Sequence, residues 1–116
     1  MKYNDLIVYK NSKLLFSVLI KIVRKFPYEG KYLVNQILRA ANSIHANIAE
    51  GFGRSEAEFK RYLTSALGSC NELISHIEDA LMSGYIRKDT AEKLIEKYNI
   101  VGKQIYCLRN RWKKYK

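Results

Sequence analysis

Apolar side chains recur every three to four residues along most of the chain, the spacing of one face of an α-helix. This pattern predicts four helical segments, at about residues 4–26, 28–50, 55–84 and 89–112. The apolar faces comprise Leu15, Val18, Leu19, Ile22 and Phe26 in the first segment; Leu33, Ile37, Ala41, Ile44 and Ile48 in the second; Phe59, Leu63, Ala66, Cys70, Leu73, Ile77 and Leu81 in the third; and Leu94, Tyr98, Val101, Ile105, Leu108 and Trp112 in the fourth.

Proline and glycine mark the breaks between these segments. Pro27 ends the first, because the residue before a proline is pushed out of the helical region. Gly51 follows the second, with Gly53 two residues beyond, and a glycine there can adopt the left-handed conformation that closes a helix. Gly84 ends the third segment in the same way.

Two segments begin with the residues of a capping box, in which two side chains satisfy each other's free backbone N–H. Ser55 and Glu58 form this pair at the start of the third segment, and Asp89 and Glu92 at the start of the fourth. Linkers of a few residues make consecutive helices antiparallel. We therefore predict an all-α fold, an up-down-up-down four-helix bundle that forms a single domain over residues 1–116.

The charge is unevenly distributed over this bundle. Of the net +10, residues 1–26 carry +5 (six basic, one acidic) and residues 86–116 carry +7 (ten basic, three acidic). Residues 55–85 carry −3 (two basic, five acidic), and residues 27–54 carry +1 (three basic, two acidic). Since the first and last helices of such a bundle are neighbours, we expect their basic faces to merge into one surface.

The residues proposed to bind nucleic acid lie on these two helices, because ammonium and guanidinium groups displace the counterions of phosphates. They are Lys10, Lys13, Lys21, Arg24, Lys25, Arg109, Arg111, Lys113 and Lys114. Tyr106, Trp112 and Tyr115 are interleaved among the last of them and could stack on bases. Two alternatives stay open: the charge forms only a solvated surface, and Trp112, in phase with Leu108, belongs to the core or to a contact between subunits.

No residue pattern predicts catalysis. His45 and His76 are the only histidines, and neither has neighbouring Cys, Asp or Glu at a metal-ligand spacing. We expect no metal, no cofactor and no enzymatic activity. No segment resembles a secretory signal or a membrane span. Cys70 and Cys107 are expected to be reduced core thiols, and the protein is expected to be cytoplasmic.

The segment RAANSIHANIAEGFGR, residues 39–54, is rich in small residues that allow a close helix approach. Gly68 and Ser69 would supply the matching surface on the third helix. The polar members of this structural motif are Arg39, Asn47, Glu50, Arg54 and Glu72, with Gly51 beside them. We expect Glu50 or Glu72 to pair with Arg39 or Arg54, and any buried member to be hydrogen-bonded.

This motif, together with the downstream EFKRYLTSALGSCNEL, resembles the bacterial four-helix-bundle proteins encoded in 23S rRNA intervening sequences. The resemblance covers nearly the whole chain. It implies a ring-shaped homopentamer of antiparallel bundles. A related branch of accessory proteins in diversity-generating retroelements implies binding to RNA and a reverse transcriptase.

Three hypotheses follow. The first is a non-enzymatic, homo-oligomeric scaffold that binds nucleic acid, with RNA preferred to DNA. The second is a protein-interaction adaptor for a reverse transcriptase or another large enzyme. The third and weakest is a small hydrolase or nuclease that would depend on Glu50 or Glu72.

Overall fold

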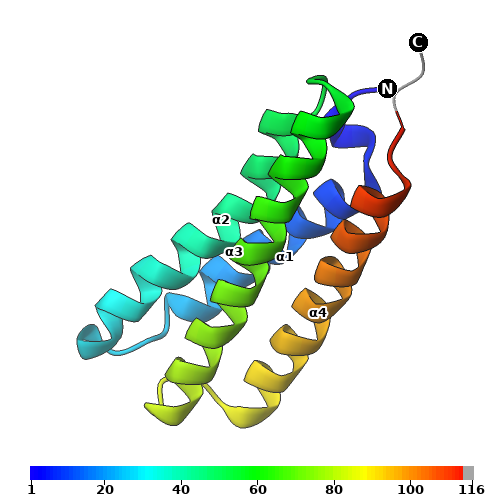
Figure 1. Cartoon of the computed structure of the whole chain (residues 1–116). Coiled ribbons are helices and arrows are strands. Elements are labelled where there is room, and N and C mark those ends of the chain that lie inside the picture. Colours follow the sequence, from blue (N-terminus) through cyan, green and yellow to red (C-terminus); the bar gives the residue numbers. More distant parts are fainter. Residues whose placement is uncertain (114–116) are drawn as a thin grey trace.

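The computed structural model describes residues 1–113. The elements are a 3-10 turn η1 (Tyr3–Asp5), α1 (Ile7–Val23), a second 3-10 turn η2 (Tyr28–Gly30), α2 (Lys31–Gly51), α3 (Glu56–Met82) and α4 (Lys88–Arg111). Consecutive helices run in opposite directions, and the start of α1 and the end of α4 lie at the same end of the bundle (Figure 1). The predicted all-α fold is confirmed for the described residues.

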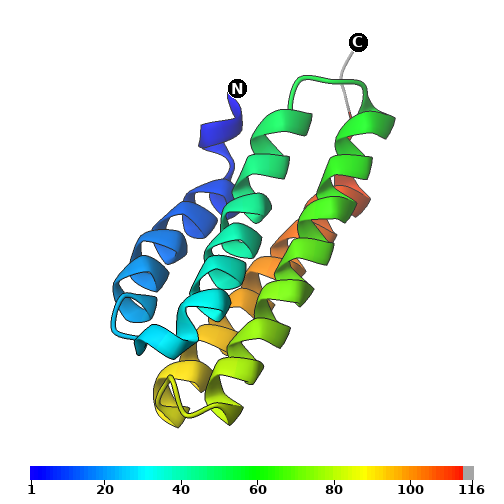
Figure 2. The ribbon, with the colours of Figure 1, turned by 90° about the vertical axis from the view of Figure 1, so that its left-hand side faces the viewer.

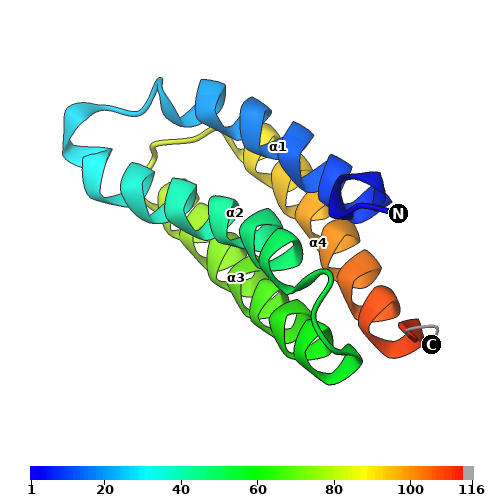
Figure 3. The same ribbon diagram turned by 90° about the horizontal axis from the view of Figure 1, so that it is seen from above.

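The four helices do not pack equally against one another. The helices α2 and α3 share the most extensive interface and run side by side (Figure 3), whereas α1 packs mainly on α2 and less extensively on α4. Figure 2, turned by 90° from Figure 1, shows α1, α2 and α3 in succession. The bundle extends 52 × 20 × 19 Å, so it exposes long helix faces relative to its core.

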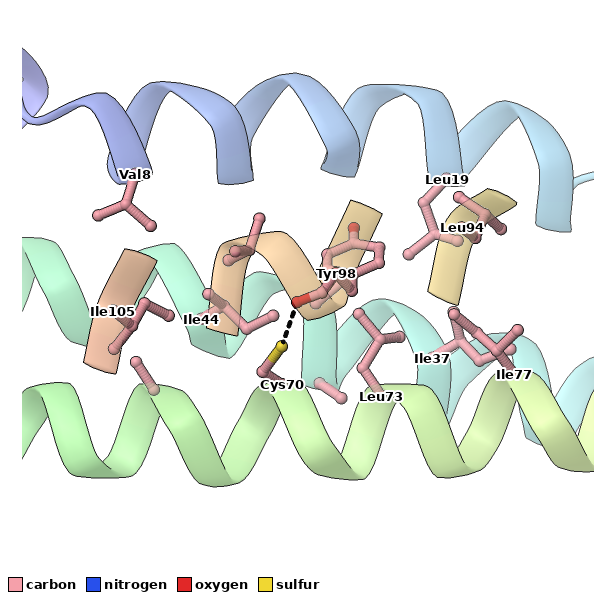
Figure 4. Packing of buried hydrophobic residues seen from close by; sticks show 14 of the residues in the cluster. Val8, Leu19, Ile37, Ile44, Cys70, Leu73, Ile77, Leu94, Tyr98 and Ile105 are labelled. Carbon is pink, nitrogen blue, oxygen red and sulfur yellow. Dashed lines mark hydrogen bonds between the residues drawn. The ribbon is translucent and has the colours of Figure 1, made fainter. Parts of the chain in front are cut away.

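The core is formed by one apolar face from each helix (Figure 4). It includes Val8 and Leu19 of α1, Ile37, Ile44 and Ile48 of α2, Phe59, Leu63, Cys70, Leu73 and Ile77 of α3, and Leu94, Tyr98, Val101 and Ile105 of α4. The Cys70 thiol donates a hydrogen bond of 3.1 Å to the Tyr98 carbonyl and so links α3 to α4. The predicted faces of the last three helices are largely confirmed.

The first helix differs from its prediction. Leu6 is extended, so α1 begins at Ile7 and is preceded by η1, where the sequence predicted a helix from Asn4. Its buried positions are Val8, Ser12, Leu19 and Val23, and the Ser12 hydroxyl is satisfied by the Val8 carbonyl at 2.7 Å. Val18 was expected in the core, but it is 46% exposed. The side of α1 that packs against the other helices carries these four buried residues, and Val18 lies outside it.

The predicted N-terminal cap is confirmed for α3 and wrong for α4. The Ser55 hydroxyl accepts a hydrogen bond of 3.2 Å from the Glu58 N–H, which confirms the N-cap of α3. Asp89 is not the cap of α4: Arg87 occupies that position, and the Asp89 carboxylate accepts from the Thr90 N–H at 2.8 Å inside the first turn.

Of the two glycines predicted to end a helix, Gly84 does so and Gly51 does not. Gly84 adopts φ +77° and ends α3 as predicted. At the end of α2, however, Gly51 is still helical, and Gly53 takes the left-handed conformation at φ +89°.

Candidate nucleic-acid interface

The basic side chains of α1 and of the residues that follow it form an exposed row along the bundle. We call this group the α1 cations: Lys10, Lys13, Lys21, Arg24 and Lys25. No acidic residue lies within Ile7–Val23. Within residues 1–113 none of the α1 cations is paired with a carboxylate. The span from Lys10 to Arg24 is about 21 Å at the helical rise of about 1.5 Å per residue.

The cations at the end of α4 do not all join this row. Arg111 and Lys113 are exposed. Arg109 instead turns toward α3, where its Nη1 donates to the Thr64 hydroxyl at 3.1 Å and its guanidinium lies 5.1 Å from the centre of the Tyr106 ring. The expectation that Arg109 shares a face with α1 is therefore wrong. Lys114, Tyr115 and Lys116 lie outside the described residues.

Where α1 and α4 meet, the surface is apolar rather than basic. A groove of about 430 Å³ has Leu6, Ile7 and Val8 on one side and Gln104 and Leu108 on the other. The Asn11 side-chain NH₂ donates to the Gln104 side-chain oxygen at 3.3 Å across the same junction. The two basic segments are thus separated here, and the predicted merged surface is not formed at this junction.

Two aromatic side chains of the C-terminal region have different roles. The Trp112 ring lies 4.9 Å from the Phe59 ring and 5.7 Å from the Phe52 ring, both edge-on, so it closes the end of the core. This confirms that Trp112 packs in the core rather than forming a platform for bases. Tyr106 remains 52% exposed.

The polar motif of α2 forms a surface ion pair at the turn to α3. The Arg54 guanidinium contacts the Glu50 carboxylate at 2.9 Å and the Glu58 carboxylate at 3.5 Å, and the hydrogen bond to Glu50 raises the pKa of Arg54. The predicted pairing of Glu50 with Arg54 is confirmed. Arg39 instead donates to Gln36 at 3.1 Å, and Glu72 contacts His76 at 3.2 Å.

The small residues of α2 and α3 meet at one hydrogen-bonded contact. The Ser43 and Ser69 hydroxyl oxygens lie 2.8 Å apart, and the Asn47 amide donates to the Ser43 carbonyl at 2.8 Å. Gly68 does not take part, because an added Cβ there would meet nothing within 4 Å. The close packing expected at Gly68 occurs instead at Gly51 within this chain.

The buried histidine and the two thiols complete the titratable groups of interest. His45 lies edge-on to the Tyr9 and Phe16 rings, and burial, followed by the charge of Lys13, lowers its pKa to about 4. Cys70 is buried as predicted, but Cys107 is exposed, contrary to prediction. Within the described residues no group of three or more His, Cys, Asp or Glu side chains could hold a metal ion.

The sequence model of the 23S rRNA-intervening sequence protein family matches residues 4–107. The chain belongs to this family. A similar solved structure is a protein of unknown function from the S23 ribosomal protein family of Bacteroides thetaiotaomicron. It is 26% identical, with a TM-score of 0.83, and the alignment covers 95% of this chain and 99% of that one. No curated protein matches the chain.

For this member of the 23S rRNA-intervening sequence protein family, sequence reasoning missed one group of surface residues. Asn99, Lys103 and Tyr106 follow one another at helical spacing on α4 and share a groove with Asn71 of α3. Their i, i+4 and i+7 positions could have revealed one face, but only the packing of α3 on α4 adds Asn71.

None of the helices in residues 1–113 is both long and apolar enough to cross a membrane.

Proposed function

We propose that this protein is a non-enzymatic, homo-oligomeric helical scaffold that binds nucleic acid through the α1 cations. The observation that carries the proposal is their lack of carboxylate partners within residues 1–113. A cation already paired within the protein would gain less from a phosphate, because it would first have to give up its carboxylate. Unpaired cations can each release a counterion from the phosphate backbone when the nucleic acid binds.

RNA is the preferred ligand in this proposal. Its support is the family to which the chain belongs, whose name ties it to intervening sequences of 23S rRNA. A row of cations about 21 Å long follows a phosphate backbone without reading base edges. We therefore expect affinity from the α1 cations and little sequence preference from them.

Self-association is supported by apolar side chains on the surface of α1 and α4. Ile7, which precedes the span from Lys10 to Arg24, is 69% exposed. On α4, Ile100 is 48% exposed. Contact with another copy would remove these side chains from water. The resemblance implies five subunits, and light scattering would give the number.

An adaptor for a reverse transcriptase is the second candidate. The apolar groove between α1 and α4 favours it, because a hollow lined by Leu6, Ile7, Val8 and Leu108 suits a protein partner better than a phosphate backbone. The two functions predict different dependences. An adaptor contact would weaken on substitution of Ile7, whereas nucleic-acid binding would weaken on substitution of Lys10 and Lys13.

The test is an electrophoretic mobility shift with RNA and DNA at low salt. Changing Lys10, Lys13, Lys21 and Arg24 to Glu should abolish the shift without unfolding the bundle, since all four side chains are exposed. The matched control carries the same charge change at exposed cations of the other helices that have no carboxylate partner in residues 1–113, namely Lys31, Arg39, Arg61 and Lys97, and should retain most of the shift. An equal loss of the mobility shift in both variants would mean that binding depends only on the net charge of the protein, and this would contradict the proposed site.

A further inference from the structure

A second surface with polar and aromatic character lies between α3 and α4. It is an open groove of about 550 Å³, lined by Leu67 and Asn71 of α3 and by Asn99, Lys103 and Tyr106 of α4. Small-molecule sites commonly have volumes of about 300 to 1,000 Å³, so the groove can accommodate a ligand group. No carboxylate is present among its described lining residues. Its chemistry therefore differs from both the α1 cations and the apolar groove beside α1.

Tyr106 supplies a stacking surface at this groove. Its side chain is 52% exposed, and the guanidinium of Arg109 lies over its ring at 5.1 Å. Arg109 is held in place by hydrogen bonds to the Thr64 hydroxyl at 3.1 Å and to the Asn110 side-chain oxygen at 3.4 Å. The remaining N–H groups of Arg109 are available to a phosphate at the edge of the ring.

Asn71 and Asn99 supply hydrogen-bonding groups to the same groove, one from each helix. Both side chains are exposed. A side-chain amide carries an acceptor oxygen and a donor NH₂ group, which can pair with the edge of a nucleobase. Lys103, four residues beyond Asn99 on α4, adds a positive charge without a carboxylate partner in residues 1–113.

We propose that this groove binds an unpaired nucleobase of a single-stranded nucleic acid. The base stacks on the face of Tyr106 opposite Arg109, its edge faces Asn71 and Asn99, and the adjoining phosphates contact Lys103 and Arg109. This inference rests on the proposed function and adds a base-binding site to it. Unpaired bases can be turned outward onto aromatic side chains, whereas the bases of a duplex are held in its stack.

The charges around the groove favour one path for the nucleic-acid strand beyond the bound base. A neighbouring hollow along α4 is lined by Glu92 and Glu96 as well as Lys103, and two carboxylates there would repel phosphates. Toward the other end of α4, Arg109 is followed by Arg111 and Lys113. The strand therefore leaves the groove toward the C-terminal end of α4.

The test compares single-stranded oligouridine and oligoadenosine RNA, the equivalent single-stranded DNA and an RNA duplex of the same length. Tyr106→Ala should lower the affinity for the better-bound single strand at least fivefold, a change of about 1 kcal/mol for one stacked base. Affinity for the duplex should change by less than about twofold. Tyr106→Phe, which keeps the ring, should bind like the wild type.

Tyr32→Ala is the matched control, because Tyr32 is 72% exposed on α2, away from the groove. It should leave binding of every probe unchanged. The salt dependence of Tyr106→Ala should equal that of the wild type, since stacking releases no counterion. Irradiation of RNA that carries a photoreactive uracil should attach it to the peptide containing Tyr106 and Cys107, and this cross-link should be lost in Tyr106→Ala.

Each other outcome overturns the proposal. If Tyr106→Ala lost the same affinity for the single strand and for the duplex, Tyr106 would contact the nucleic-acid backbone rather than an unpaired base. Wild-type affinity in Tyr106→Ala, with binding still abolished by charge reversal of the α1 cations, would remove the base site and leave the proposed function intact. No binding of any probe at low salt would overturn both. A changed molecular mass of Tyr106→Ala in light scattering would assign the groove to a contact between copies of the chain.

Discussion

A Cβ atom added at Gly51 would lie 2.5 Å from the Cβ of Tyr62, closer than two such atoms can approach. The last turn of α2 therefore lies directly against the first part of α3, and glycine permits this approach. Gly68, in the interior of α3, is the opposite case, because an added Cβ there would meet nothing within 4 Å.

These two glycines predict opposite effects of the same substitution. Gly51→Ala should lower the free energy of unfolding by about 1–3 kcal/mol through overpacking against Tyr62. Gly68→Ala should raise it by about 0.5–1 kcal/mol, because alanine is the better helix former. Urea unfolding of both variants at one protein concentration measures the difference. Stabilisation by Gly51→Ala would contradict the close approach.

The hydroxyl of Tyr98 is buried in the core without a hydrogen-bond partner in residues 1–113. Burial raises the pKa of this phenol, since the charged form is disfavoured there. Tyr98→Phe should leave the free energy of unfolding unchanged or raise it by up to about 2 kcal/mol, because an unsatisfied polar group is removed. Tyr106→Phe, with an exposed hydroxyl, is the control. A loss above about 1 kcal/mol in Tyr98→Phe would show that the hydroxyl is satisfied.

His45 makes stability depend on pH below neutrality. Its side chain is 4% exposed, its Nε2 lies 3.2 Å from the Asn42 side-chain oxygen, and its pKa is lowered to about 4. In the unfolded chain His45 binds a proton near pH 6.5, whereas in the folded chain it does so only near pH 4. The contribution of neutral His45 is therefore complete above pH 6.5 and lost as the pH falls toward 4, a change of about 3 kcal/mol.

The measurement for His45 is the difference between the wild type and His45→Phe in chemical denaturation from pH 7.5 to 4. Taking the difference removes the titration of carboxylates common to both proteins. The wild type should lose stability more steeply over this range. Parallel curves would mean that His45 titrates at the same pH in both states.

The two thiols should differ in reactivity. Cys70 is 1% exposed, and burial raises its pKa to about 11, while Cys107 is exposed. Because the thiolate is the reactive form, a maleimide at neutral pH should label one thiol in the native chain and two in the denatured chain. Cys107→Ser should remove the native label. Rapid modification of Cys70 in that variant would show that the core opens.

Local signals in the sequence predicted much of the fold because they act within a few residues. Pro27, Ser55 and Gly84 each mark a helix end through their own backbone or side-chain chemistry, and periodicity located the core faces of α2, α3 and α4. The start of α4 was ambiguous, because Asp89 can cap a helix or bond to the next N–H, and the structure has the second arrangement.

The candidate sites depend on packing between helices, which periodicity alone does not specify. Arg109 was expected beside α1, but its direction is set by Thr64, which precedes it by 45 residues in the chain. Asn71 and Asn99 carry no individual signal and share a groove only because α3 packs on α4. The exposure of the α1 cations, by contrast, follows from their helical spacing, and sequence analysis identified them.

The dependence of RNA affinity on salt concentration tests the central claim most directly. The logarithm of the association constant for single-stranded RNA should fall against the logarithm of salt. The five α1 cations, each displacing one counterion, should contribute about −3.5 to that slope, beyond the share of Lys103 and Arg109. Changing Lys10, Lys13, Lys21 and Arg24 to Glu should flatten that slope or abolish binding. A wild-type slope near zero, or no binding at low salt, would contradict the assignment of these cations to nucleic acid.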